Sequence, residues 1–161
     1  AVGLGEQKQF AGTSEILYAM YVLDKNDPEK LYFAANYAVN AKDYDTALKY
    51  YDELKRINYS GEGTAYFATN VANDREESFN SKADRDRFVA LKTHVKPREE
   101  KIPSKRGEIY RNIALILVEK GKVEEAKTAI KDARAANPDD TSLIISEANL
   151  YLQTKDFATY K

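Results

Sequence analysis

The feature that most constrains this fold is a pattern of two helices and a tight turn, between Gly107 and Asp140, that recurs along the chain. In its first half, apolar residues repeat at the spacing of one helix face, at Ile109, Ile113, Ile116 and Leu117. Gly121 then supplies the turn, because glycine adopts the positive φ that ends a helix. The second half repeats this spacing with smaller residues, at Ala126, Ile130 and Ala133, and Asn137-Pro138 stops it. The pattern predicts two antiparallel helices that pack closely through alanines.

The same design lies upstream, in residues 28–61. Its first helix presents mostly small residues, at Leu31, Ala34, Ala35 and Ala38. After a turn at Lys42-Asp43, a second helix carries Tyr44, Ala47, Leu48, Tyr51 and Leu54. Ala47 and Ala126 are equivalent, 79 positions apart. Two repeats of roughly 34 residues leave about 11 residues over, which predicts an insertion between the two helix pairs.

Both ends of the chain carry parts of the same pattern. Residues 1–10 show no clean period, and we expect a helix to begin at Thr13 or Ser14 and to end at Asn26-Asp27-Pro28. Residues 141–161 start a further pair, with Ala148 equivalent to Ala114 and Asp156-Phe157 at the next turn. Because the chain begins without methionine and stops inside a helical pattern, we interpret it as a fragment or processed form.

Residues 62–106 depart from the repeat. Thr64–Asn70 is rich in strand formers, Asn73-Asp74 signals a turn, and the stretch 64–79 predicts a small β-hairpin. Ser81 is expected to cap a helix over Lys82–Thr93, and Ser104 to cap the helix that follows. Between them we expect a connector at 94–106, since Pro97 and Pro103 exclude a continuous helix. This insert either carries a specific function or is a packing adaptation.

The supply of chemical groups argues against catalysis and metal binding. The chain has no cysteine, and His94 is its single histidine, so no metal site or catalytic triad has the residues it needs. No run of residues is long and apolar enough to cross a bilayer, and no signal peptide is visible. The net charge of −1 disfavours a dedicated nucleic-acid or anionic-membrane binder at the level of the whole chain. We expect no cofactor, no membrane insertion and no enzyme activity, and the cell compartment stays undetermined.

The pattern resembles the tetratricopeptide repeat (TPR) family, and the composition hints at a bacterial member with an irregular insert. The resemblance rests on Tyr110, Ile113-Ala114, Gly121, Ala126, Ala133 and Pro138, with Ala34-Ala35 and Pro28 in the upstream repeat. It implies an all-α, right-handed solenoid of antiparallel helix pairs. Its units would be a partial repeat at 1–27, complete repeats at 28–61 and 107–140, an irregular unit at 62–106 and a truncated repeat at 141–161.

The resemblance also implies a function: recognition of a protein or peptide in a concave groove lined by first helices. The groove candidates are Tyr32, Asn36, Asn40, Arg111, Asn112, Asn149 and Gln153. Tyr32 is the tyrosine expected on an exposed face, whereas Tyr37, Tyr44, Tyr51 and Tyr110 are expected where helix pairs meet. Asparagine and arginine can hold an extended peptide by its backbone or a carboxylate. Solvated helix faces are the alternative reading of these residues.

A second candidate site is a run of basic residues from Lys92 onward. Its proposed contacts to an anionic partner are Lys96, Arg98, Lys101, Lys105 and Arg106, against Glu99 and Glu100. A solvated loop explains the same charges, and interleaved aromatic residues for nucleic-acid binding are missing.

The leading function from sequence is therefore a non-catalytic binding scaffold. Two alternatives remain: an assembly module that stacks with further repeats or self-associates through its open ends, and a helper domain of a larger enzyme.

Overall fold

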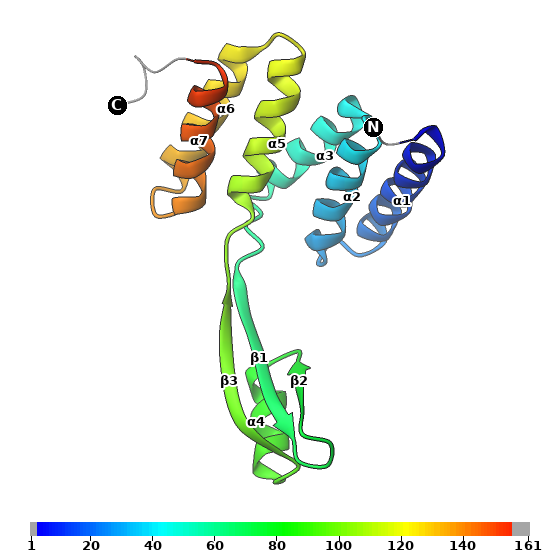
Figure 1. The fold of residues 1–161 in the computed structure, drawn as a ribbon, viewed down its shortest axis with the longest axis vertical. Helices are drawn as coiled ribbons and strands as arrows, with labels where there is room; N and C mark the ends of the chain where they lie inside the picture. Colours follow the sequence, from blue (N-terminus) through cyan, green and yellow to red (C-terminus); the bar gives the residue numbers. More distant parts are fainter. Residues whose placement is uncertain (1–2, 156–161) are drawn as a thin grey trace. The chain divides into compact units, whose positions relative to one another are not determined.

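A computed structural model describes residues 3–155 and divides the chain into two compact units. The first, here called the helical unit, comprises Ala1–Ser60 and Lys105–Lys161. The second, the sheet unit, is Gly61–Ser104 and is inserted between them. Over the described residues the protein is mostly helical, as expected, but a small three-stranded antiparallel sheet replaces the single hairpin, so the protein contains more sheet than an all-α fold (Figure 1).

The helical unit contains both predicted helix pairs. The first pair is α2 (Pro28–Asn40) and α3 (Tyr44–Arg56), and the second is α5 (Arg106–Glu119) and α6 (Val123–Ala136). Lys42 turns the first pair with φ 60° and Gly121 turns the second with φ 75°. Ala34, Ala47 and Ala126 are fully buried, because the helix backbones approach closely where side chains are short. The predictions for 28–61 and 107–140 are confirmed at the level of these helices.

The first helix, α1 (Leu4–Leu23), begins earlier than the sequence pattern suggested. Ser14 is not an N-cap, because it lies inside the helix, where its buried hydroxyl donates to the carbonyl of Ala34 at 2.7 Å. Thr13 likewise donates to the carbonyl of Gln9, one turn back. The helix ends before Asn26, and Pro28 occupies the first turn of α2, where a missing N–H costs nothing.

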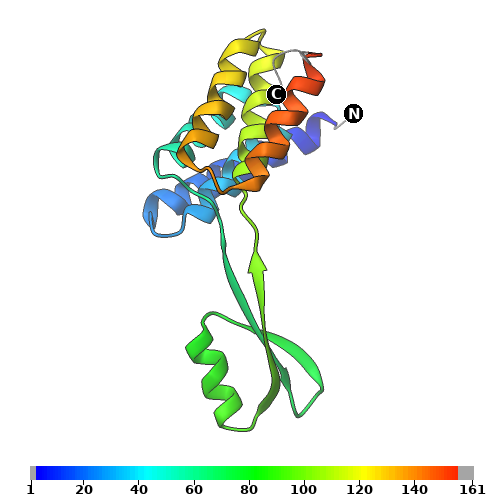
Figure 2. The same cartoon turned by 90° about the vertical axis from the view of Figure 1, so that its left-hand side faces the viewer.

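The last described helix, α7 (Thr141–Gln153), packs beside α5 (Figures 1 and 2). The backbone N–H of Gly107 donates to the Ser142 hydroxyl at 3.0 Å, and Ser146 donates to the carbonyl of Gly107. A Cβ at Gly107 would lie 2.5 Å from the Ser142 carbonyl oxygen, so this approach requires glycine.

Two boundaries were expected near this pair, at Ser104 and at Asp156-Phe157. Ser104 does not cap α5, because the helix begins one residue later, with Lys105 at the N-cap and no side-chain hydrogen bond there. The expected turn at Asp156-Phe157 lies outside the described residues.

The sheet unit begins with the predicted hairpin. Strands β1 (Gly63–Asn70) and β2 (Arg75–Phe79) pair antiparallel, with Tyr66 opposite Phe79 and Asn70 opposite Arg75. Helix α4 (Lys82–Ala90) follows, and Ser81 caps it by accepting a hydrogen bond from the Asp84 N–H. The helix ends before the expected Thr93 because Lys92 turns with φ 59°.

The expected connector is instead a third strand, β3 (His94–Ile102), which pairs with β1 to give the order β2-β1-β3. Pro97 is tolerated because β3 is an edge strand and its register shifts opposite Ala68, where no ladder hydrogen bond is required. Proline therefore excluded a helix here but not a strand.

Helix α4 covers one face of this sheet. Rings of Phe79, Phe88 and His94 meet there at centroid distances of 5.2–5.4 Å. Arg85 lies buried over the Tyr66 ring and pairs with Asp86 and Glu99. The opposite face carries Phe67, with the Arg98 guanidinium 4.2 Å above its ring.

The close approach of α5 and α7 generates a stability prediction. Gly107→Ala is expected to lower the free energy of unfolding by about 1–3 kcal/mol, because the new methyl group displaces the Ser142 backbone. Gly12→Ala is the matched control: nothing lies within 4 Å of its new Cβ, and alanine should stabilise α1 by about 0.5–1 kcal/mol. Urea unfolding followed by circular dichroism measures both, and equal effects at the two sites would contradict the packing argument.

Candidate functional site

Three of the seven predicted groove residues are drawn into a polar network between helices. Tyr32 donates to Oε2 of Glu108 at 2.8 Å, and Nδ2 of Asn36 donates to Oε1 of the same carboxylate at 3.3 Å. The Tyr51 hydroxyl donates to Oδ1 of Asn36 at 2.6 Å and accepts from Nδ2 of Asn112 at 2.8 Å. The network joins α2, α3 and α5, whose residues are far apart in sequence.

Burial shows that this network is internal. Tyr32 is only 5% exposed, so the expectation that it lies on an open face is wrong. Asn36 and Asn112 are half-buried, and Tyr51 is fully buried as expected, whereas Tyr37, Tyr44 and Tyr110 are half-buried. Burial, together with the hydrogen bond to Glu108, raises the pKa of Tyr32 to about 12, and burial also raises the pKa of Tyr51. These side chains hold helices together and are not displayed to a ligand.

The other four groove candidates are exposed on first helices, as expected. Asn40 lies on α2, Arg111 on α5, and Asn149 and Gln153 on α7. Sequence reasoning missed their apolar neighbours. Leu115 is exposed one turn after Arg111, and Ile145 and Leu152 are 64% and 58% exposed on α7. Leu115 lies four positions after Arg111, and Ile145 and Leu152 lie four positions before and three positions after Asn149. Because residues three or four positions apart share a helix face, this spacing could have revealed them from the sequence.

These residues share one face of two neighbouring helices. Gly107 and Ser142 meet near the starts of α5 and α7, so the two helices run in the same direction. Arg111 and Ile145 then occupy equivalent positions, 34 residues apart, as do Leu115 and Asn149. The result is a surface, here called the α5–α7 face, that combines aliphatic groups with one guanidinium and two amides.

The residues of the predicted anionic-partner site are divided between the two units. Lys105 and Arg106 belong to the helical unit, where Lys105 pairs with Glu29 and Arg106 with Asp140, both at 3.2 Å. In the sheet unit, Arg98 binds Glu76 through two nitrogens at 2.7 Å and Glu100 at 2.9 Å. Lys96 and Lys101 are exposed on β3.

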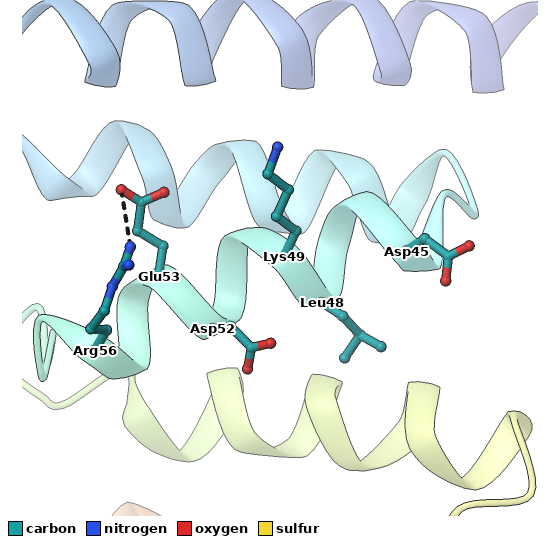
Figure 3. A pocket seen from close by; sticks show the side chains of 6 residues that line it. All are labelled: Asp45, Leu48, Lys49, Asp52, Glu53 and Arg56. Atoms are coloured by element: carbon teal, nitrogen blue, oxygen red, sulfur yellow. Dashed lines mark ion pairs between the residues drawn. The ribbon is translucent and has the colours of Figure 1, made fainter.

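A hollow of about 590 Å³ lies along α3 (Figure 3). Its lining alternates charges, from Asp45, Lys49, Asp52, Glu53 and Arg56, around Leu48. Glu53 pairs with both Arg56 and Lys25, and Lys120 hydrogen-bonds to Asp45 and lowers the pKa of that carboxyl. Most of the charges that line the hollow are therefore paired with oppositely charged neighbours.

His94 is a structural residue of the sheet unit. Its Nε2 lies 2.9 Å from Oε2 of Glu77, its Nδ1 lies 3.0 Å from the Thr93 hydroxyl, and the ring is buried. The hydrogen bond with His94 lowers the pKa of Glu77. Within residues 3–155, no group of three or more metal-ligating side chains comes together, and no helix is long and apolar enough to cross a bilayer.

Comparisons with protein-family models, with curated proteins and with solved structures give no match to this chain. The candidate surface therefore rests on its own geometry.

The polar network generates a prediction with a control on the same helix. Asn36→Ala is expected to cost about 1–3 kcal/mol of unfolding free energy, because it removes a hydrogen-bond partner from the buried Tyr51 hydroxyl and another from the half-buried Glu108 carboxylate. Asn40→Ala, at an exposed position of α2, should change stability by less than about 0.5 kcal/mol. Thermal and urea unfolding measure both, and a neutral Asn36→Ala would show that the network carries no stability.

The raised pKa of Tyr32 predicts alkaline sensitivity. Because the folded state keeps this phenol protonated, its contribution to stability is complete below pH 10 and is lost as the pH rises from about 10 through about 12. Tyr32→Phe removes the titrating group, so its unfolding free energy should fall less over this range than that of the wild type. Urea unfolding at several pH values tests this, and parallel curves for the two proteins would contradict it.

Proposed function

We propose that this chain is a non-catalytic scaffold, a TPR-like right-handed solenoid that binds a protein or peptide segment along its first helices. The observation that carries the proposal is the α5–α7 face, where Ile145 and Leu152 are exposed on α7 and Arg111 is exposed at the position of α5 equivalent to Ile145. Exposed aliphatic groups next to a few polar ones are typical of recognition surfaces.

The arrangement of the helices supports a rigid surface. Hydrogen bonds between Gly107 and two serines of α7 tie α5 to α7, and the Tyr32–Glu108 bond ties α2 to α5. Helices α2, α5 and α7 are therefore joined by hydrogen bonds, and a backbone that is already ordered loses little freedom on binding.

The exposed groups define the chemistry of a fitting partner. Ile145, Leu152 and Leu115 would bury one or two aliphatic side chains. Arg111 would bind a carboxylate, and Asn149 and Gln153 would bind backbone amides and carbonyls. An extended segment with an aliphatic residue near an acidic group combines these features.

A different observation favours a second candidate function, assembly. On α1, Ile16 and Leu23 are exposed, and no atom lies within 4 Å of a Cβ placed at Gly5 or Gly12. This uncovered helix face suits another helix, from further repeats or from another copy of the chain.

Selection of binding peptides from a random display library, using the whole chain as bait, tests the leading proposal. The double variant Ile145→Ser/Leu152→Ser and the single variant Arg111→Ala should each lower the affinity for the selected peptides by about fivefold or more. Thr128→Ala/Lys131→Ala, on the exposed side of α6, is the matched control and should leave affinity unchanged.

The outcomes separate the candidates. Selected peptides that lose affinity only with the α5–α7 variants support groove recognition. Peptides that are equally sensitive to the α6 control, or no selected peptides at all, contradict it. Oligomers that disappear with Ile16→Ser/Leu23→Ser in analytical ultracentrifugation would support assembly instead.

A further inference from the structure

One end of the sheet unit gathers exposed apolar side chains from two loops. This end, here called the tip, consists of residues 70–75 and 87–96, and lies opposite the end where Gly63 pairs with Ile102 (Figure 1). Val71 is 57% exposed on the β1–β2 turn, and Leu91 is 63% exposed after α4. Phe88 and Val95 belong to the same end and are also exposed. Such a group of apolar residues on a small unit indicates an interaction surface.

Charge is segregated along the same unit. The tip carries four cations, Arg75, Arg87, Lys92 and Lys96, against one carboxylate, Asp74. The remainder of Gly61–Ser104 carries seven carboxylates against four cations. The unit as a whole is neutral, so the positive charge is concentrated at the apolar end.

The ion pairs of the sheet unit also differ between the tip and the remainder of the unit. Away from the tip, Lys82 and Arg85 pair with Glu99, and Arg98 pairs with Glu76. Among the residues that the structure describes, the four tip cations make no ion pair with any carboxylate. Their charge is therefore available to an external anion.

The tip is also held in one shape before any partner arrives. The Val71 N–H donates to the carbonyl of Thr93 at 3.0 Å, which ties the two loops together. The Thr93 hydroxyl donates to the carbonyl of Phe88. Asn70 and Asn73 accept backbone hydrogen bonds within the turn. Binding would therefore cost little ordering of the backbone.

We propose that the tip docks on an anionic lipid surface. Val71 and Leu91 enter the zone between headgroups and acyl chains, while Arg87, Lys92 and Lys96 contact lipid phosphates. The tip is the protruding end of its unit, and the hollows described for this chain are lined by residues of the helical unit. An anionic bilayer interface accepts an apolar end with a basic rim, because it presents acyl chains and negatively charged headgroups side by side.

Co-sedimentation of the whole chain with vesicles tests this. Vesicles of phosphatidylcholine with about 30 mol % phosphatidylglycerol should bind the protein, and pure phosphatidylcholine vesicles should not. Lys92→Gln/Lys96→Gln should weaken partitioning by about tenfold or more, since each cation near an anionic surface is worth roughly fivefold. Val71→Ser/Leu91→Ser should weaken partitioning as strongly. Lys82→Gln/Lys101→Gln is the control, because it removes the same charge from positions away from the tip.

Each other result would overturn the assignment. Equal loss with the Lys82/Lys101 control would show that net charge alone is sensed. Full binding by Val71→Ser/Leu91→Ser would show that no apolar group enters the bilayer. Polyglutamate that binds with the same dependence on Val71 and Leu91 would assign the tip to an acidic protein. Circular dichroism of each variant confirms that the exposed substitutions leave the fold intact.

Discussion

The helical unit depends on contacts that cross an interruption of the chain. Between α3 and α5 the backbone leaves to build the sheet unit and returns, and the Lys105 N–H donates to the Ser60 carbonyl at 2.7 Å where the two ends meet. The Tyr32–Glu108 bond and the Asn36–Tyr51–Asn112 bonds then join the two helix pairs. Buried polar groups are stabilising only when all are paired, so this network specifies one arrangement of the pairs.

The network also limits which residues can form the candidate binding surface. Asparagines on first helices were reasonable ligands for a peptide backbone, but Asn36 and Asn112 are occupied by other side chains of the same chain. The groups that remain open lie on α5 and α7, where Arg111 stands beside exposed aliphatic residues. Ion pairs distinguish the cations of the sheet unit in the same way. Arg98 pairs with Glu76 and Glu100, whereas Lys92 and Lys96 pair with no carboxylate among the described residues.

Much of the local structure was predictable because its causes are local. Helical spacing of apolar residues predicted both complete pairs, the glycine residue Gly121 predicted a turn, and strand formers around Asn73-Asp74 predicted the hairpin. The strand at His94–Ile102 was missed because it is rich in charged residues and contains Pro97. It becomes a strand only by pairing with β1, which no local pattern reveals.

The sequence by itself therefore determined the helix pairs and their turns, since each follows from residue type and spacing. The tertiary structure decided which of those residues face solvent. Tyr32 and Arg111 were equal candidates in the sequence, yet one is buried against Glu108 and the other is exposed. The difference arises because burial and hydrogen bonding depend on partners more than seventy positions away, and only folding brings those partners into contact.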